Sequence, residues 1–401
     1  MRYILSASAA VFFVGFSGAQ ADVFSVLTDV SGVQASASFE SVEDTFNTLD
    51  TAQFSAINSA YTGVEVATVS INYRGLPMIT RYPTAGSTLL TFEVPALGIS
   101  QSFSGATRDE SEDMLGDYLE NNVGDILGRM SRELARNSPV DPIAGNPNSL
   151  MTQLVMQDFS NSFNSFASNI KDGGTSSNLI GIGFGMGQFK QAGITSRSYT
   201  IPLSYTFRND LDPRRQIALN APLTFVDTEG SKSYYLGLGG SYRFPMNDNW
   251  ALMPAVNLAL AGSVDLGVLA AVGSLSLTSN YLIRMPKFDI AIGNMLGYYT
   301  TLKVASGDFS YDPGISNTVL RNGLVLSHPV TVSGKKMSLE YSLVDTRFFG
   351  DPLYIEQFNE IGVSLGTNKS AASSRSYFKS GLSYLHSSKS KGFSVNLGFW
   401  F

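Results

Sequence analysis

The chain has 401 residues with no Cys, 38 Gly, 26 Phe and 18 Tyr, and only 15% of its residues are charged, for a formal net charge of −6. The absence of Cys excludes disulfide frameworks, thiolate metal sites, Cys nucleophiles and a lipoprotein anchor, and the acidic balance argues against a nucleic-acid partner. After the amino-terminus no apolar run reaches the ~20 residues of a membrane helix, so low charge and many aromatic residues together indicate a membrane β-barrel.

Residues 1–21 are predicted to be a secretory signal peptide. Arg2 precedes the apolar segment Ile4–Phe16, and small residues follow that end in Ala19 and Ala21. A basic start, a short apolar segment and an A-x-A pattern are typical of a signal that is cleaved during export. We therefore expect Ala19 and Ala21 to define the cleavage site.

Residues 22–105 are predicted to form a small β-rich region with a loosely ordered start. Strand-like runs occur at Val64–Tyr73 and Ser87–Phe103. No repeat with the ~20–30-residue period of a solenoid is present. This region is therefore expected to be short and non-repetitive.

Residues 106–148 are predicted to form a long amphipathic helix and a linker. Thr107 and Glu110 match a T-x-x-E capping box, and apolar residues then recur every three or four positions as far as Leu134. The segment Ser138–Asn148 is rich in Pro, Asn and Gly, as linkers are.

A second helix is predicted within residues 149–175, from about Ser149 to Ile170. One face is apolar, and the other carries Ser and Asn side chains that are too polar for lipid. At about 1.5 Å per residue the helix would be roughly 33 Å long, close to the height of a bilayer.

Residues 177–401 are predicted to form an all-β fold, an antiparallel transmembrane β-barrel of twelve strands. Alternating apolar residues define a lipid-facing row on each strand, and the named rows contain no Asp, Glu, Lys or Arg. A basic residue on such a row costs ~2–4 kcal/mol at mid-bilayer, which supports this register. The last strand has the most regular row: Phe393, Val395, Leu397, Phe399 and Phe401.

The lumen-facing rows are expected to be polar with charges of both signs, namely Arg243, Asp289, Arg321, Glu340, Glu360 and Lys379. This lining predicts internal ion pairs, with a selectivity filter as the alternative. If both barrel termini are periplasmic, the turns near residues 209–214, 246–249, 285–287, 331–335 and 367–376 lie on that side. The loops near 306–313 and 347–354 then lie outside.

The strand that ends in Phe401 resembles the last strand of bacterial outer-membrane β-barrels, and the resemblance implies recognition by the barrel assembly machinery. A signal peptide, an upstream region, a helix just before strand one and twelve strands resemble an autotransporter β-domain, in particular the solitary autotransporter-like barrels. That resemblance implies a helix inside the barrel and export of the upstream region. Gly181, Gly183, Gly185 and Gly187 share the inner face of strand one, where glycine permits close backbone approach, and we expect the helix to face them.

An enzyme is not expected. His386 and Ser388 have the H-x-S spacing of outer-membrane phospholipases, a resemblance that implies a lipid-facing Ser/His/Asn set, but Asn396 on the next strand has inward parity. We predict no catalytic, cofactor-binding or metal site, because the sequence has no Gly-rich phosphate loop and no metal-ligand cluster.

The sequence therefore predicts an outer-membrane barrel of a Gram-negative bacterium that anchors, and exports or displays, its amino-terminal region. A small-solute channel with a periplasmic amino-terminal domain is the alternative, and an outer-membrane phospholipase is a remote one. The expected partners are outer-membrane lipids and the assembly machinery, and the barrel is expected to be monomeric.

Overall fold

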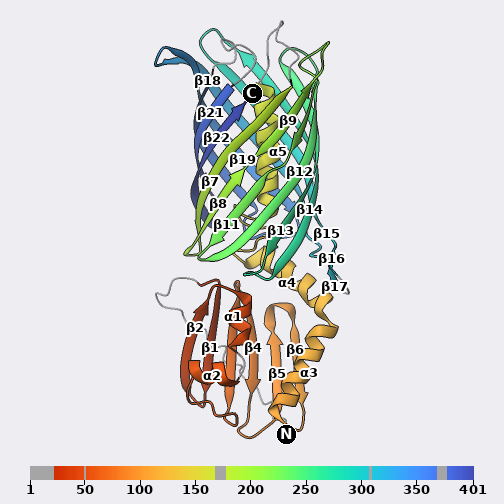
Figure 1. Cartoon of the computed structure of the whole chain (residues 1–401), viewed down its shortest axis with the longest axis vertical. Helices are drawn as coiled ribbons and strands as arrows, with labels where there is room; N and C mark the ends of the chain where they lie inside the picture. The colour runs from red at the N-terminus through yellow and green to blue at the C-terminus, as the bar shows by residue number, and fades with distance from the viewer. Residues whose placement is uncertain (1–21, 49–50, 168–177, 307–308, 368–376) are drawn as a thin grey trace, which may run out of the picture.

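The structure, a computed structural model, describes residues 22–48, 51–167, 178–306, 309–367 and 377–401 (Figure 1). A region of sheet and helices and a closed barrel follow one another along the longest axis of the molecule. The predicted signal peptide with Ala19 and Ala21 lies outside the described residues. The same holds for the end of the predicted second helix and for most of the predicted turn at 367–376.

The amino-terminal region contains a six-stranded antiparallel sheet in the order β2-β1-β3-β4-β5-β6. Its strands are β1 (Phe24–Val30), β2 (Val33–Phe39), β3 (Ala67–Tyr73), β4 (Leu76–Tyr82), β5 (Leu89–Val94) and β6 (Ile99–Ser104). The prediction of a loosely ordered start is wrong, because β1 lies inside the sheet and alternates buried and half-buried residues. Ser31 and Gly32 have φ of 49° and 90°, which suits the tight turn of the β1–β2 hairpin.

Four helices pack on one face of this sheet: α1 (Val42–Asn47), α2 (Thr51–Ile57), α3 (Arg108–Asn121) and α4 (Val123–Asn137). A short 3₁₀ helix, η1 (Pro95–Leu97), separates β5 from β6. Thr107 caps α3 as predicted, since its side chain accepts a hydrogen bond from Glu110 N. The single long helix is wrong, however: it breaks at Asn122, whose side-chain amide donates to Tyr118 O at 2.8 Å and closes the end of α3.

The carboxy-terminal sheet contains fourteen segments, and because Pro202 and Pro222 each interrupt one strand, they form a closed antiparallel barrel of twelve strands. The segments are β7 (Leu179–Gln191), β8 (Ile194–Ile201), β9 (Leu203–Arg208), β10 (Gln216–Asn220), β11 (Leu223–Thr228), β12 (Ser231–Pro245), β13 (Trp250–Ser263), β14 (Val268–Arg284), β15 (Asp289–Leu302), β18 (Ser316–Val332), β19 (Lys335–Gly350), β20 (Gln357–Thr367), β21 (Tyr377–His386) and β22 (Ser390–Trp400). The hairpin of β16 (Val304–Ser306) and β17 (Phe309–Tyr311) lies in the connection from β15 to β18. The predicted fold class is confirmed.

The register agrees with the predicted rows. Strand β22 pairs with β7 from Ser390 opposite Gln191 to Trp400 opposite Gly181, which closes the barrel. The predicted outward residues of β22, Phe393 to Phe401 at odd numbers, are 40–57% exposed. An outer surface of exposed apolar side chains is what a lipid-facing wall requires.

Residues 22–137 lie at one end of the barrel, and Phe401 lies at the other (Figure 1). Turn length does not distinguish the two ends. Two-residue turns occur at Ala192–Gly193 and Glu229–Gly230 near the amino-terminal region, and at Ser333–Gly334 at the opposite end. Short turns therefore do not identify the periplasmic end of this barrel.

Candidate functional site

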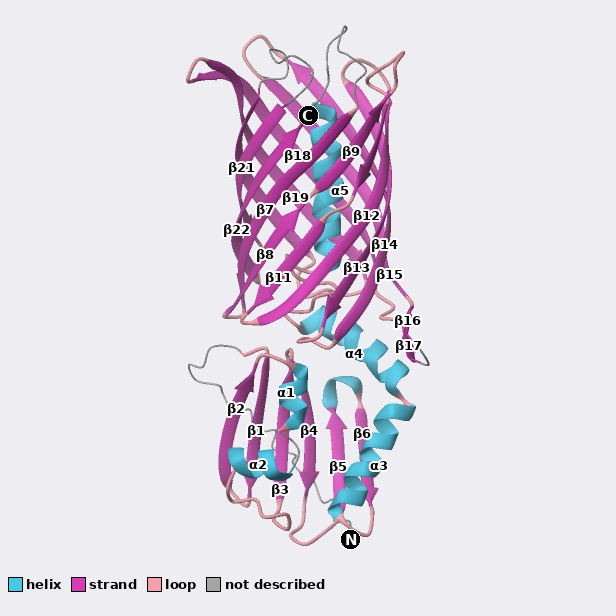
Figure 2. Cartoon of the chain, in the orientation of Figure 1, coloured by secondary structure: helices cyan, strands magenta, loops and turns pink. Residues whose placement is uncertain are grey.

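Helix α5 (Leu150–Ala167) runs through the barrel lumen, and its first residues lie at the end that carries residues 22–137 (Figure 2). It packs mainly on β13 and β14 and also contacts β12 and β15. Leu150, Met151, Leu154 and Val155 are buried near its start. The helix therefore lies against one side of the lumen, which confirms that a helix occupies the barrel.

A buried carboxylate fixes this helix to the wall. Asp158 is 6% exposed, and its carboxylate accepts hydrogen bonds from the Tyr299 hydroxyl at 2.7 Å and from Asn257 Nδ2 at 2.6 Å. Ser276 and Ser274 donate longer bonds of 3.4 and 3.5 Å to the same carboxylate. A buried charge is tolerated only when its lone pairs are satisfied, and here donors from three strands satisfy them.

One helical turn further on, Ser162 makes a second polar contact with the same wall. Its hydroxyl accepts a bond of 2.8 Å from Asn280 Nδ2. Neither Asp158 nor Ser162 was predicted from the sequence. The available signal was a lone carboxylate, Asp158, on an otherwise Ser- and Asn-rich helix face.

Two ion pairs on the far wall account for four of the six predicted lumen charges. Arg321 Nη2 lies 2.6 Å from Glu360 Oε2, and Lys379 Nζ lies 2.7 Å from Glu340 Oε2. The Arg321 guanidinium also lies 5.2 Å from the centre of the Phe159 ring on α5, at a distance typical of a cation–π contact.

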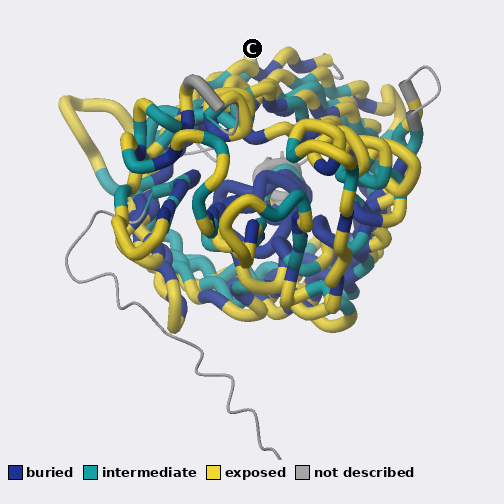
Figure 3. The backbone as a smooth tube through the Cα atoms, turned by 90° about the horizontal axis from the view of Figure 1, so that it is seen from below, coloured by how far each residue is buried: buried dark blue, intermediate teal, exposed yellow. Residues whose placement is uncertain are grey.

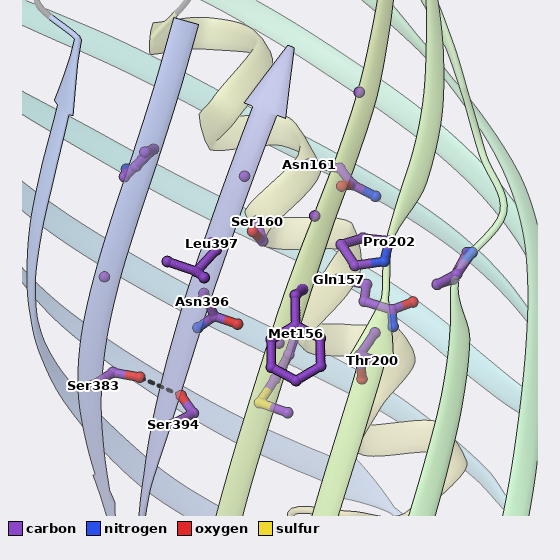
Figure 4. Close-up of a pocket in the computed structure, with 18 of the residues that line it drawn as sticks. Met156, Gln157, Ser160, Asn161, Thr200, Pro202, Ser383, Ser394, Asn396 and Leu397 are labelled. Carbon is purple, nitrogen blue, oxygen red and sulfur yellow. Dashed lines mark hydrogen bonds between the residues drawn. The ribbon is translucent and has the colours of Figure 1, made fainter.

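A cavity of about 390 Å³ separates α5 from the opposite wall (Figure 4). On the helix side it is lined by Gln153, Met156, Gln157, Ser160 and Asn161. The barrel side includes Thr200, Ser383, Ser394 and Asn396, and the hydroxyls of Ser383 and Ser394 are hydrogen-bonded at 2.6 Å. This lining combines polar, apolar and charged side chains, and the helix leaves this part of the lumen unfilled.

Gly181, Gly183, Gly185 and Gly187 line this cavity and face the helix across it. The expected close approach of the helix is not observed. A Cβ at these positions would first meet atoms of the barrel itself: the Ser204 hydroxyl beside Gly181, Leu397 O beside Gly183 and the Asn396 side chain beside Gly185. The glycines therefore make room for neighbouring strands and their side chains.

The predicted linker is one of the most buried segments of the chain. Every residue from 141 to 150 is buried. Seen from below, the molecule has buried backbone near its centre and mostly exposed backbone around it (Figure 3). Gln191 Nε2 donates to Pro139 O at 2.5 Å, and Asn148 Nδ2 donates to Ser196 Oγ at 2.9 Å. Since β7 ends and β8 begins at this end of the barrel, the segment 138–149 fills the mouth. We call it the mouth plug.

Backbone hydrogen bonds reinforce the mouth plug. Ile355 N donates to Gly145 O at 2.9 Å, and Tyr354 N donates to Ala135 O at 2.7 Å. Gly145 has φ +92°, and a Cβ there would overlap Ala135 O. Glycine is therefore required at this position.

A buried ion pair connects the mouth plug to the sheet region. Arg74 Nη1 lies 3.2 Å from Asp141 Oδ1, and the two side chains are 4% and 0% exposed. Asp141 Oδ2 also accepts bonds from Ile143 N and Ala144 N. Burial raises the pKa of the Asp141 carboxyl, while Arg74 and the backbone donors act in the opposite direction.

The sheet region also bonds directly to the barrel loops. The Tyr73 hydroxyl donates to Leu266 O at 3.2 Å, and Val42 N donates to Asp265 O at 2.8 Å. With the ion pair and the mouth plug, these contacts hold residues 22–137 against the barrel.

His386, Ser388 and Asn396 do not come together. His386 is exposed on the outer surface, whereas Asn396 lines the cavity. The sequence analysis missed Asn359, which is the cross-strand partner of His386 on β20. In the described part of the chain, no hydrogen bond joins His386 to Ser388 or Asn359.

No group of three or more His, Asp or Glu residues within the described ranges could hold a metal ion. None of the helices described has the length and apolar character needed to span a bilayer.

No protein-family model matches this chain, and no curated protein matches its sequence. Solved structures do match. The β-domain of the Bordetella autotransporter BrkA is similar at 12% identity and a TM-score of 0.45, over 56% of this chain and 98% of that one. The translocator domain of the autotransporter NalP from Neisseria meningitidis is similar at 12% identity and a TM-score of 0.48, over 62% of this chain and 94% of that one. An outer-membrane channel from Pseudomonas putida F1 is similar at 11% identity and a TM-score of 0.39, over 58% and 99%.

The fold and its interior define an outer-membrane-type β-barrel of twelve antiparallel strands with a helix in its lumen. Autotransporter domains are among the structures it resembles, as the sequence predicted, and so are channels.

Proposed function

We propose that this chain is an outer-membrane barrel of autotransporter type that anchors residues 22–137 and displays them outside the cell. One observation carries the proposal: these residues and Phe401 lie at opposite ends of the barrel, and α5 connects them through the lumen. An even number of strands leaves both ends of the barrel chain on one side. If the barrel inserts from the periplasm, that side stays periplasmic, and residues 22–137 are outside.

Protease treatment of intact cells tests the display. A recognition sequence for a site-specific protease would be inserted after Gly63, beside the exposed Val64. The same sequence inserted after Gly334, in the turn at the opposite end, is the control. We expect cleavage of the first variant in intact cells and of the second only after the outer membrane is opened. The reverse pattern would contradict the proposal.

The cavity beside α5 supports a second candidate, a small-solute channel. Its volume of about 390 Å³ would hold a small molecule, and its lining includes polar and charged side chains beside apolar ones. The mouth plug opposes conduction, because it fills one end of the lumen. We expect the intact protein to show almost no conductance in planar bilayers and a variant lacking residues 149–170 to conduct. A sizeable steady conductance of the intact protein would favour the channel.

We also propose that the terminal strand is the segment recognised by the outer-membrane assembly machinery, as the sequence resemblance implies. Replacement of Phe401 by Ser is expected to lower the amount of assembled barrel several-fold. Phe378→Ser is the control, since Phe378 is 39% exposed on the neighbouring strand. An equal loss from both variants would mean that the terminal position has no special role.

A further inference from the structure

Basic side chains face each other on the outer surface of the barrel, near the end that carries residues 22–137. Lys391 on β22 is the cross-strand partner of Lys190 on β7, and His386 on β21 is the partner of Lys391. All three are exposed. They form a continuous row across three neighbouring strands, which we call the basic row.

The two lysines of the basic row repel each other. Directly opposite side chains of an antiparallel pair have Cβ atoms only about 4.5–5.5 Å apart, and like charges there are destabilising. No carboxylate of the described residues lies within ion-pair distance of Lys190 or Lys391. An external anion at this position would convert the repulsion into attraction.

The same row continues with hydrogen-bonding groups. Asn359 is the partner of His386, and Asp345 is the partner of Asn359. The Asp345 carboxylate accepts bonds of 2.9 Å from Arg347 Nε and from Gln357 Nε2. These polar groups extend the basic row down the lipid-facing wall.

This polar extension reaches well into the barrel wall. Asp345 is followed by Thr346, which hydrogen-bonds to Arg321, the residue that lies over Phe159 in the middle of α5. On the other side of the barrel, Leu258 and Leu260 keep the corresponding wall apolar. A lipid-facing ionic group at such depth is costly in hydrocarbon. Arg347 offsets part of this cost, and a further polar partner against β19, β20 and β21 would lower it.

Apolar side chains lie next to the polar groups, toward the Phe401 end. Phe393 and Ile361 are 57% and 59% exposed and belong to the same outward rows. The surface thus offers cations, then amide and carboxylate groups, then apolar contacts. A molecule that fits it carries phosphates, sugar-like hydroxyls and acyl chains in that order.

We propose that this surface binds a phosphorylated glycolipid of the membrane leaflet nearest residues 22–137. Its phosphates lie against Lys190 and Lys391, its sugar groups against Asn359, Gln357 and Asp345, and its acyl chains along Phe393 and Ile361. The assignment to the outer leaflet rests on the orientation proposed above. Binding by the purified protein does not depend on that orientation.

Native mass spectrometry of the full chain in neutral detergent tests the proposal, with lipid A as the bisphosphorylated probe. The test variant is Lys190→Gln/Lys391→Gln. The matched control is Lys335→Gln/Lys336→Gln, two exposed lysines at the opposite end. Each lysine near a lipid phosphate contributes about a few-fold in affinity, so binding by the test variant should be roughly tenfold or more weaker, with the control unchanged.

Two further measurements separate the glycolipid from other sources of phosphate. Dephosphorylated lipid A, phosphatidylglycerol and inorganic phosphate should each bind or compete at least tenfold more weakly than lipid A. Without lipid, the test variant should unfold at a slightly higher temperature than the unmodified chain, because a repulsion is removed; with lipid A this order should reverse. Equal binding by both double variants, or equal binding of phosphatidylglycerol, would overturn the proposal.

Discussion

The two walls of the lumen differ in how they meet helix α5. The wall of β12–β15 packs against the helix and holds Asp158 with four hydrogen-bonding side chains. The wall around β7 and β22 faces the helix across a cavity of about 390 Å³. The hydrogen bonds of Asp158 therefore join the helix to one wall, while on the far wall Arg321 contacts Phe159. The mouth plug fills one end of the lumen, and a cavity remains beside the helix.

The mouth plug is expected to be the most sensitive element. In Gly145→Val the new side chain would overlap Ala135 O, and the φ of +92° disfavours any β-branched residue. We expect the mouth plug to be displaced. The variant should then conduct ions in planar bilayers, whereas almost no conductance is expected of the unmodified protein. Gly116→Val is the control, because nothing lies within 4 Å of a Cβ there. If the Gly145 variant stays silent, the mouth plug is not the seal.

The packed wall should depend on Asp158. In Asp158→Ala the Tyr299 hydroxyl and Asn257 lose their acceptor, so the free energy of unfolding should fall by about 2–4 kcal/mol. Gln157→Ala removes a neighbouring side chain that faces the cavity and should cost less than about 1 kcal/mol. Urea unfolding measured by heat-modifiable gel migration compares the two. Equal losses would mean that the walls do not differ.

The cavity wall should tolerate some substitutions and reject others. At Gly183 a Cβ would lie 2.5 Å from the backbone oxygen of Leu397, whereas at Gly185 the nearest atom is the Asn396 side chain at 3.0 Å. Gly183→Ala should therefore lower stability by about 1–3 kcal/mol, and Gly185→Ala by less than about 1 kcal/mol. If the helix packed on these glycines, both substitutions would be equally harmful. The same unfolding assay decides between these outcomes.

The smallest expected effect is the pH dependence at the junction. Burial raises the pKa of Asp141 above its unfolded value of about 3.9. A carboxyl group whose pKa is higher in the folded than in the unfolded protein stabilises the fold while it is protonated. This contribution is complete at pH values below the unfolded pKa and is lost as the pH rises through the folded pKa. Asp141→Asn should remove this component, so the difference in unfolding free energy between the two proteins should change over that window. A constant difference from pH 3.5 to 7 would show that Asp141 does not titrate differently on folding.

Much of the barrel was predictable because one physical rule governs each strand. A lipid-facing row must be apolar along its whole length, so Phe393 to Phe401 and the rows before it could be read directly from alternation. The lumen-facing positions of Arg321, Lys379 and their partner carboxylates followed from the residues between the lipid-facing ones. Which charge pairs with which did not follow, because that depends on strand register. The capping of α3 by Thr107 was also local, and therefore visible in the sequence.

The remaining features depend on tertiary contacts. The mouth plug has the composition of a linker, and only the barrel loops that surround Gly145 bury it. The β1–β2 hairpin was missed because a Ser- and Thr-rich alternation can also belong to a loop. The glycines of β7 were correctly assigned to the lumen face, but parity does not reveal which neighbour needs the space. The side of the barrel on which α5 rests is set by Asp158, whose partners lie 99 to 141 residues away.

The side of the membrane on which residues 22–137 lie decides whether the barrel displays them. Because the chain has no Cys, single cysteines can report this without background. Gln34→Cys is exposed on the sheet region, and Lys335→Cys is exposed at the opposite end. With a membrane-impermeant maleimide, we predict that Gln34→Cys is labelled on intact cells. Lys335→Cys should be labelled only after the outer membrane is permeabilised. Labelling of Lys335→Cys alone in intact cells would contradict the account.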